Sequence, residues 1–378
     1  GVLELRDREG FQVEAAQHRL VLGELAQQDL HRDVAVHAEL LGAIHGAHAT
    51  GADLGGDDEA LVDGHADIAV GAPTADHLVL GKPVKDTGSI TVLSGANGSV
   101  IPGFPQYGVF AGDKLGTAVA LAGDVNGNIS PDVHVVAGAP LADRDSSGVI
   151  TKDLGSIRIY NASTGSLLAE RFGLAVKDNF GAAVAAAGDV NSDNYDDVLV
   201  GAPLVDRSVL VDVNGVSKVQ KWVDAGQVQL LSGSVLSLGT SGALQTFDGP
   251  AAKSGFGRVV AGNADINNDG LLDVAIGAPL MDVTEVVDSK NVIRKDVGRV
   301  YVYTAGTGSV QPQIQIQGLA AGDQVGSAVG LAKDLNGDGA DDIVMGAAKA
   351  DRTNIVSTKT GSKTVIVKDV GKLAGYSG

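Results

Sequence analysis

Short runs of alternating hydrophobic and polar residues recur along most of the chain. In DLGSIRIYNASTGS at 153–166 and DVGRVYVYTAGTGS at 296–309, hydrophobic residues occupy every second position and a glycine-containing turn follows. This two-residue period is that of a β-strand with one buried face, and glycine turns of this kind are typical of hairpins. The pattern predicts strands here and in the matching segments 86–99, 224–234 and 369–378.

Two further strands are predicted around each of several acidic segments. A hydrophobic–glycine pair precedes the acidic segment and begins a run of small residues, as in GTAVALAGD and GAAVAAAGD, which suits a strand crowded by neighbouring backbones. A short hydrophobic run ending in Gly-Ala-Pro or Gly-Ala-Ala follows the acidic segment and predicts a buried strand. The pairs are Leu115-Gly116, Phe180-Gly181, Phe256-Gly257 and Val325-Gly326.

These marks define a long repeat. The acidic segments begin at Asp124, Asp189, Asp265 and Asp334, about 70 residues apart on average. One unit reads strand, turn, strand, acidic loop, buried strand and a hairpin of varying length, and four short strands at a long fixed period are typical of a β-propeller blade. Parallel β-helices repeat at a much shorter period, and a βαβ arrangement needs amphipathic helices that this pattern lacks. The sequence therefore predicts an all-β propeller with about five to six blades visible.

The acidic segments are predicted to bind calcium. They follow the spelling D-x-[ND]-x-[DN]-G-x-x-D, as in GDVNSDNYDDVLVGAP at 188–203. Calcium takes six to eight oxygen ligands at about 2.3–2.6 Å, and side chains at positions one, three and five, the carbonyl at seven and the carboxylate at nine would supply them. Glycine at position six permits the sharp reversal. Asx turns alone would explain one copy, but repeated copies favour a cation cage.

Other metal sites fit this spelling less well. An EF-hand needs Glu at position twelve and flanking helices, and zinc is disfavoured because the loops lack Cys and His. We expect the loops at Asp265 and Asp334 to bind most tightly, the loop at Asp189 slightly less, and the loop at Asp124 weakly. The candidate ligands are Asp124, Asn126, Asn128 and Asp132; Asp189, Asn191, Asp193 and Asp197; Asp265, Asn267, Asp269 and Asp273; Asp334, Asn336, Asp338 and Asp342; and, in a damaged copy, Asp63 and Asp67.

The Phe-Gly-type pair, the acidic loop and the closing Gly-Ala-Pro together resemble the FG-GAP repeats of the integrin α-subunit head. The resemblance covers about residues 59–378. It implies a seven-bladed propeller with calcium loops on several blades, although four complete units with a half at each end are fewer than seven. The implied function is an extracellular or cell-surface adhesion or ligand-recognition module.

Residues 1–58 carry none of the repeat marks. We interpret them as a separate N-terminal segment, either disordered or not authentic repeat sequence, for example from a shifted reading frame. The leucine- and alanine-rich stretch 30–49 also fits a helix. The segment is rich in histidine, but its histidines lack a tight ligand spacing, so metal binding there is not favoured.

Composition narrows the range of functions. A net charge of −18 argues against nucleic acid and anionic membrane surfaces as partners. No hydrophobic run reaches the roughly 18 residues that a membrane span needs. Zero cysteines exclude disulfides and a cysteine nucleophile. The chain begins at Gly1 without a signal region, which fits a mature or excised piece of a protein with further domains or a partner subunit.

No arrangement typical of catalysis is present, so we do not expect an enzyme. The repeat region lacks a Gly-x-Ser-x-Gly elbow and a phosphate-binding glycine run. Two alternatives to a recognition module stay open: the non-catalytic propeller of a larger secreted hydrolase or lyase, and a purely structural surface repeat protein.

Variable segments after each Gly-Ala-Pro are the candidate sites for a protein or glycan ligand. They are 74–85, 141–152, 204–223, 280–295 and 349–368. Trp222 lies in one of the longest and is a candidate anchor, although packing under its own hairpin is an equal alternative. Asn97 and Asn161 fit the glycosylation sequon.

Overall fold

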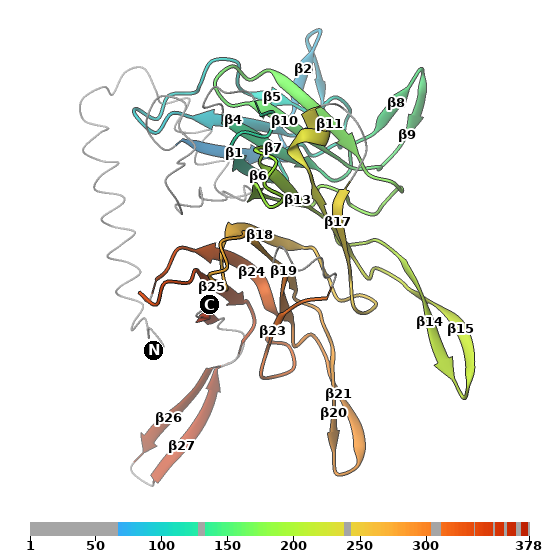
Figure 1. Ribbon diagram of the computed structural model, residues 1–378, viewed down its shortest axis with the longest axis vertical. Helices are drawn as coiled ribbons and strands as arrows, with labels where there is room; N and C mark the ends of the chain where they lie inside the picture. Colours follow the sequence, from blue (N-terminus) through green and yellow to red (C-terminus); the bar gives the residue numbers. More distant parts are fainter. Residues whose placement is uncertain are drawn as a thin grey trace. The chain divides into compact units, whose positions relative to one another are not determined.

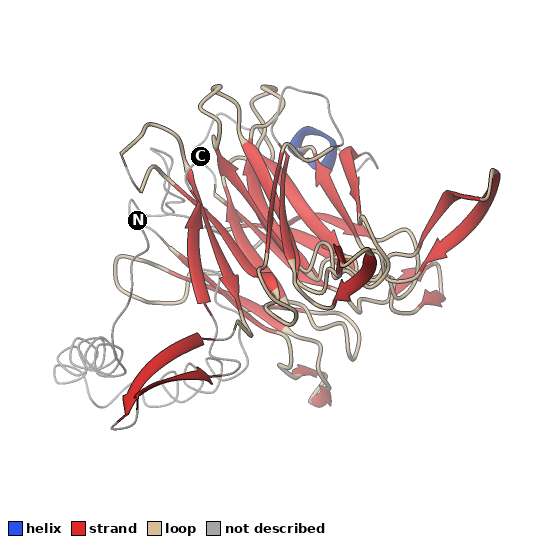
Figure 2. Cartoon of the chain, turned by 90° about the horizontal axis from the view of Figure 1, so that it is seen from below, coloured by secondary structure: helices blue, strands red, loops and turns tan. Residues whose placement is uncertain are grey.

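The computed structural model describes residues 67–127, 133–237, 243–303, 311–335, 337–350, 352–358, 361–367 and 372–376. The predicted N-terminal segment 1–58 and the ligand candidates Asp63, Asn128, Asp132 and Asn336 lie outside these residues. The described part is all-β, and its one helix is the five-residue α3 (Gly233–Ser237) (Figure 2). Within it, no helix has the length and hydrophobicity that crossing a membrane requires.

Five antiparallel sheets follow one another along the described chain, one for each repeat unit (Figure 1). The second, third and fourth sheets have four strands, in which each strand pairs with the next along the sheet. They are β6 (Ala118–Ala122), β7 (His134–Ala139), β10 (Ser156–Asn161) and β11 (Leu167–Phe172); β12 (Ala183–Gly188), β13 (Asp197–Ala202), β16 (Gln227–Leu231) and β17 (Ala243–Asp248); and β18 (Val259–Ala264), β19 (Asp273–Ala278), β22 (Arg299–Tyr303) and β23 (Ile314–Gln317).

Three strands are described in the first and in the fifth sheet. These are β1 (Ile68–Ala72), β4 (Ser89–Leu93) and β5 (Gln106–Tyr107), and β24 (Val325–Ala332), β25 (Asp342–Ala347) and β28 (Lys372–Tyr376).

A separate two-stranded hairpin leaves every sheet, between the first and second described strands of the first sheet and between the second and third strands of the other four. The longer ones extend away from their sheets (Figure 1). These hairpins are the variable segments of the sequence. They are β2 (His77–Val79) with β3 (Lys82–Val84), β8 (Arg144–Ser146) with β9 (Val149–Thr151), β14 (Arg207–Val213) with β15 (Val216–Trp222), β20 (Val283–Val287) with β21 (Lys290–Arg294), and β26 (Arg352–Thr358) with β27 (Gly361–Val367).

The repeated glycines mark the closest approach of one sheet to the next. A Cβ atom on Gly201 would lie 2.1 Å from the carbonyl oxygen of Gly257 in the following sheet, and one on Gly138 would lie 1.9 Å from that of Gly181. Gly181 has a φ of +88°, and its N–H donates to the Gly201 carbonyl at 3.0 Å. The Gly-Ala-Pro glycine of one blade and the Phe-Gly glycine of the next therefore touch through their backbones, which leaves no room for a side chain.

The hydrophobic core lies between successive sheets. Ile157 of the second sheet and Phe180 and Val200 of the third share one cluster, and all three are 2% exposed or less. Similar clusters join the first to the second, the third to the fourth and the fourth to the fifth sheet. The first strands β6, β12, β18 and β24 also contact one another in that order. Each blade buries its faces only against its neighbours, as in repeat folds, and the predicted all-β propeller is confirmed.

Candidate metal-binding loops

The acidic loops connect the first strand of a sheet to the second. The loop at Asp189 joins β12 to β13, the loop at Asp265 joins β18 to β19, and the loop at Asp334 joins β24 to β25. Neighbouring strands in each sheet are antiparallel. Each loop therefore lies at the opposite end of its sheet from the hairpin that follows the second strand. The ninth position begins the second strand, as predicted, at Asp197, Asp273 and Asp342.

The first carboxylate of the Asp189 loop folds the loop around itself. Its Oδ1 accepts the N–H of Asp193 at 3.0 Å, and its Oδ2 accepts the N–H of Asn194 at 2.8 Å. Asp193 in turn accepts the Tyr195 N–H at 3.0 Å, and the Asn191 amide contacts Asp193 through both its oxygen and its nitrogen. These contacts hold the side chains of positions one, three and five on the same small turn.

The same bonds recur in the next two loops. Asp265 accepts the N–H groups of Asp269 and Gly270 at 3.0 and 2.7 Å. Asp334 accepts those of Asp338 and Gly339 at 3.0 and 2.9 Å. Asn267 repeats the contacts of Asn191, and Asp338 accepts the Ala340 N–H at 3.0 Å. One loop geometry is thus repeated in three successive sheets.

The left-handed turn predicted at position six is confirmed. Asn194 has a φ of +64°, Gly270 of +84° and Gly339 of +94°. A second left-handed residue at position four was not predicted: Ser192 has a φ of +60° and Asn268 of +55°. The signal for it was weak, because position four carries only a preference for small or amide residues, which tolerate this conformation.

The ninth carboxylate is buried and ties the loop to the sheet. Asp197 and Asp273 are 0% exposed, and Asp342 is 4% exposed. Each accepts the N–H of the residue at position two, at 3.2 Å from Val190, 2.9 Å from Ile266 and 2.7 Å from Leu335. Asp197 also accepts the Gly233 N–H at 3.1 Å, which lies just beyond the third strand.

Burial changes the acidity of this carboxyl group. It raises the pKa of Asp197 to about 7, because the charged form loses its hydration. The N–H groups of Gly233 and Val190 act in the opposite direction, and the charges of Asp193 and Asp189 raise the pKa further. The ionised loop is therefore electrostatically unfavourable by itself.

The donor chemistry of the loops suits a hard cation. The side-chain ligand atoms at positions one, three, five and nine of the loops at Asp189, Asp265 and Asp334 are carboxylate or amide oxygens. A carboxylate oxygen that accepts one N–H keeps a further lone pair for a cation. Over the described ranges, no group of three or more His, Cys, Asp or Glu side chains is arranged to hold a metal ion.

The second sheet carries a histidine where the other sheets carry the ninth aspartate. His134 lies four residues before Gly138, as Asp197 lies four before Gly201, and Asn161 is its partner on the third strand. Its Nδ1 lies 3.2 Å from the Val125 nitrogen, the position-two contact that Asp197 and Asp273 also make, and 2.9 Å from the Gly123 carbonyl oxygen. His134 is 0% exposed, and its Nε2 has no hydrogen-bond partner among the described residues.

Sequence reasoning missed this position. The count of eight residues from Asp124 pointed to Asp132, which lies outside the described residues, so its role stays a prediction. The signal was the distance back from Gly-Ala-Pro, because His134 and not Asp132 has the spacing of the other copies. Asp124 itself accepts the N–H groups of Asn126 and Gly127 at 3.1 and 2.8 Å.

In the damaged first copy, only Asp67 is described among the candidates. It is 1% exposed and accepts the Gly95 N–H at 2.9 Å. This bond is equivalent to the one that Asp197 accepts from Gly233. The ninth position therefore keeps its structural contact in this sheet.

The candidate anchor Trp222 lies at the base of its hairpin. It is the last residue of β15 and is half-buried opposite Arg207, whose guanidinium carbon is 5.9 Å from its ring centroid. This contact favours packing within the hairpin over the alternative of a free anchor. Of the two sequons, Asn97 is exposed, whereas Asn161 is 9% exposed and its Oδ1 accepts the N–H groups of Ser163 and Thr164.

Comparisons with known proteins agree with the repeat. The family model of the FG-GAP repeat matches residues 180–231 and 325–366. Integrin alpha-8 of Gallus gallus is 33% identical over 172 residues, which are 45% of this chain and 14% of that protein. Integrin alpha pat-2 of Caenorhabditis briggsae is 27% identical over 227 residues, 57% of this chain and 17% of that protein.

Integrin alpha-2 of Bos taurus is 30% identical over 222 residues, again 57% of this chain and 17% of that protein. The chain thus spans less than a fifth of the length of these curated relatives. The chain contains FG-GAP repeats and is similar to integrin α subunits over about half of its length.

Proposed function

We propose that the chain is an extracellular or cell-surface calcium-binding propeller that acts as a non-catalytic adhesion or ligand-recognition module. The observation that carries the proposal is the repetition of one loop geometry at the same end of three successive sheets. In each, the first carboxylate accepts the N–H groups of positions five and six, and a buried aspartate begins the second strand.

Calcium fits this arrangement better than other common cations. The donors are carboxylate, amide and carbonyl oxygens on a flexible loop, which suits calcium more than the strict octahedron of magnesium. Zinc prefers sulfur and nitrogen ligands, which the three loops lack. Because burial and neighbouring charges raise the pKa of Asp197 to about 7, a divalent cation bound beside it would stabilise the ionised carboxylate. The cation would supply charge neutralisation and rigidity and no chemistry.

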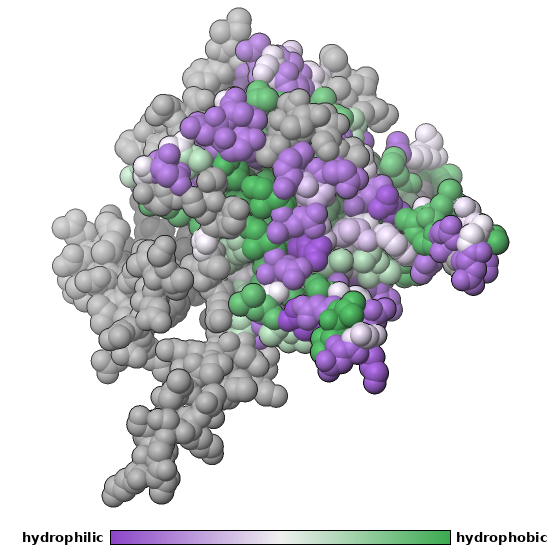
Figure 3. Space-filling view, turned by 60° about the horizontal axis from the view of Figure 1, so that its bottom comes forward, coloured by the Kyte–Doolittle hydropathy of each residue, from purple (hydrophilic) through white to green (hydrophobic). Residues whose placement is uncertain are grey.

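The hairpins at the opposite ends of the sheets are the proposed recognition surface. Leu210 and Val219 face each other across β14 and β15 and are 75% and 72% exposed. On the next hairpin, Val286 and Ile293 are 72% and 59% exposed. Hydrophobic residues reach the surface among hydrophilic ones on the face shown in Figure 3. Exposed aliphatic residues on a rigid scaffold provide contact area for a protein or glycan partner.

The proposal is tested in two steps on the full chain. Isothermal calorimetry with calcium should show binding to several sites, and each of Asp197→Ala and Asp273→Ala should remove one. Protein and glycan arrays probed in millimolar calcium should then capture ligands that Leu210→Ser/Val219→Ser loses without a change in calcium binding. Absence of calcium heat would contradict the cation proposal. Calcium binding without any array signal would favour the structural repeat protein instead.

A further inference from the structure

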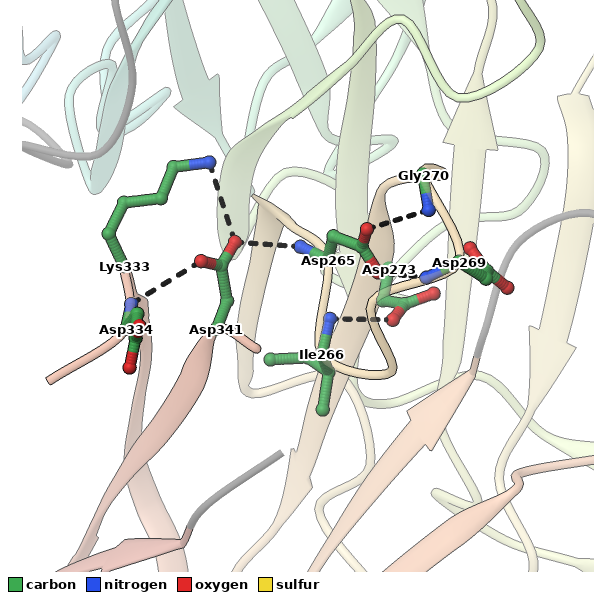
Figure 4. Close-up of polar contacts among 8 residues, drawn as sticks. All are labelled: Asp265, Ile266, Asp269, Gly270, Asp273, Lys333, Asp334 and Asp341. Carbon is green, nitrogen blue, oxygen red and sulfur yellow. Dashed lines mark hydrogen bonds and ion pairs between the residues drawn. The ribbon is translucent and has the colours of Figure 1, made fainter. Parts of the chain in front are cut away.

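The eighth residue of an acidic loop reaches across to the loop of the preceding sheet. At the junction of the fourth and fifth sheets this residue is Asp341, which is 8% exposed. Its N–H donates to the carbonyl oxygen of Asp265 at 3.0 Å, and its Oδ2 accepts the N–H of Asp265 at 2.8 Å (Figure 4). Asp265 is the first candidate ligand of the fourth sheet's loop. The two hydrogen bonds therefore fix the backbone of a candidate ligand residue in the neighbouring blade.

The same carboxylate also contacts its own loop. Its Oδ1 lies 3.4 Å from the N–H of Asp334, the first candidate ligand of the fifth sheet's loop. The Lys333 ammonium group lies 3.4 Å from Oδ2 and offsets the negative charge. One nearly buried carboxylate thus connects the backbones of the first ligands of two consecutive loops (Figure 4). Low solvent exposure makes such polar contacts stronger than surface ones.

The other junctions provide comparisons within the same chain. Between the second and third sheets, the Asp196 N–H donates to the Asp124 carbonyl at 2.9 Å, the same backbone bond. Between the third and fourth sheets, the eighth residue is Leu272, whose Cδ1 would lie 2.3 Å from a Cβ on Gly188. No hydrogen bond joins Leu272 to Asp189 within the described part of the chain. At this junction the Leu272 side chain lies against Gly188 instead.

We propose that Asp341 couples the cation occupancy of the Asp265 loop to that of the Asp334 loop, whereas the Leu272 junction leaves the Asp189 and Asp265 loops uncoupled. The inference rests on the proposed calcium binding. A cation that orders the first ligand of one loop also orders Asp341, and through it the first ligand of the other loop. The second cation then meets a smaller ordering cost. Asp341 is a positioning residue in this scheme, because it acts through Asp265 and Asp334.

Calorimetric calcium titration of the full chain tests the coupling. Asp197→Ala serves as the background, so that the Asp265 and Asp334 loops are the two strong sites. Adding Asp342→Ala should weaken calcium binding at the Asp265 loop by about fivefold or more, and adding Asp273→Ala should weaken the Asp334 loop by the same factor, because linkage is reciprocal. Removing the Asp189 loop from the native chain should leave the affinity of the Asp265 loop unchanged.

Two substitutions at Asp341 separate coupling from folding. Asp341→Leu copies the residue of the uncoupled junction, and Asp341→Asn keeps the shape of the side chain. Both should make the two loops independent. In calcium-free protein, both should also speed amide hydrogen exchange at Asp265, while exchange at Ile266, which is bonded to Asp273, serves as the internal control.

The outcomes are distinguishable. Two loops that bind independently in the Asp197→Ala background would overturn the coupling and leave calcium binding intact. Coupling that persists in both Asp341 variants would overturn the role of this residue. A complete lack of calcium heat in the native chain would refute the proposed function, and the coupling with it.

Discussion

The loops of the fourth and second sheets connect equivalent strands but close with different chemistry. In the fourth sheet, the buried carboxylate of Asp273 accepts the N–H of Ile266 at 2.9 Å. In the second, the Nδ1 of the buried His134 ring lies 3.2 Å from the Val125 nitrogen and 2.9 Å from the Gly123 carbonyl oxygen. The backbone contact is the same, but only the first loop brings a negative charge and two oxygen donors to this position.

This difference separates two roles that coincide in the other loops. The fold uses a polar side chain at the start of the second strand to contact the backbone N–H of position two. A hard cation needs oxygen donors and negative charge, which an imidazole does not supply. We therefore expect the second sheet to hold its loop with little or no help from calcium, and the third, fourth and fifth sheets to depend on it.

The largest expected effect is that of calcium on the stability of the whole chain. A site saturated at a hundredfold its Kd adds about 2.7 kcal/mol, so three sites should add about 8 kcal/mol and raise Tm by about 10 °C or more. Differential scanning calorimetry in excess chelator and in millimolar calcium measures the shift, with magnesium as the control for ionic strength. Identical transitions in chelator and in calcium would refute the proposal that calcium stabilises the three loops with a buried aspartate.

The next largest effect is the difference in stability loss between two Asp→Asn substitutions. One removes a carboxylate at the end of the sheet that carries the acidic loop, and the other removes a carboxylate at the end that carries the hairpin. Asp273→Asn should cost most of one calcium increment, about 2–3 kcal/mol in calcium, and much less in chelator. Asp288→Asn, at the exposed tip of the hairpin β20–β21 in the same sheet, removes the same charge and should change little. Urea denaturation with and without calcium separates the two. Equal losses for both variants would mean that net charge and not ligation is responsible.

A smaller effect is expected at the histidine itself. His134→Ala removes a buried ring whose Nδ1 contacts both the Val125 N–H and the Gly123 carbonyl, so we expect a loss of about 1–3 kcal/mol in the free energy of unfolding. The loss should be the same in calcium and in chelator, because His134 contacts the backbone of its own loop. His134→Gln, which retains an acceptor, should recover part of it. A loss that appears only in calcium would assign His134 a ligand role.

The smallest expected effect concerns another position at which the blades differ. Asp178 and Asp323 both stand two residues before the glycine-pair residue of their blades, Phe180 and Val325. Asp323 accepts the N–H groups of Leu319 and Ala320 at 3.0 and 2.8 Å. For Asp178, burial raises the pKa to about 6, and the charge of Asp206 adds to the shift.

These environments predict opposite effects of an Asn substitution on stability at pH 8. Because the folded pKa of Asp178 lies above the ordinary value of 3.8, its stabilising contribution is complete below pH 3.8 and is lost as the pH rises through about 6. Asp178→Asn should therefore raise the free energy of unfolding relative to the native chain, and it should do so more at pH 8 than at pH 5. Asp323→Asn should destabilise it at both values, because one oxygen acceptor becomes a donor. Urea denaturation at the two pH values compares them, and a destabilised Asp178→Asn at pH 8 would contradict the sign.

Much of this fold was readable from the sequence because its repeats impose the same register in every blade. The Gly-Ala-Pro glycine pairs with the same strand position in successive sheets, as Gly138 with Ile157 and Gly201 with Val228 show. The glycine at position six and the buried ninth aspartate were also predictable, because a sharp reversal and the start of a strand each require particular residue types at fixed positions of the loop.

Features that depend on contacts between blades were not predictable. The position of His134 is set by pairing with the third strand at Asn161, whereas counting residues from Asp124 led to Asp132. Asp341 resembles any turn aspartate in the sequence, and only the neighbouring sheet reveals that its carboxylate meets the N–H of Asp265. The exposure of Leu210 and Val219 likewise depends on the hairpin leaving its sheet, which alternation alone does not reveal.

Calcium titration of three matched chains tests the central claim most directly. The native chain, Asp197→Ala and His134→Ala differ only at the start of the second strand in neighbouring sheets, and calorimetry counts the calcium ions that each binds. We predict that Asp197→Ala binds one strongly held ion fewer than the native chain, and that His134→Ala binds the same number. A chain that keeps all its ions without Asp197, or loses a strongly held ion without His134, would contradict the separation of the structural role from the ligand role.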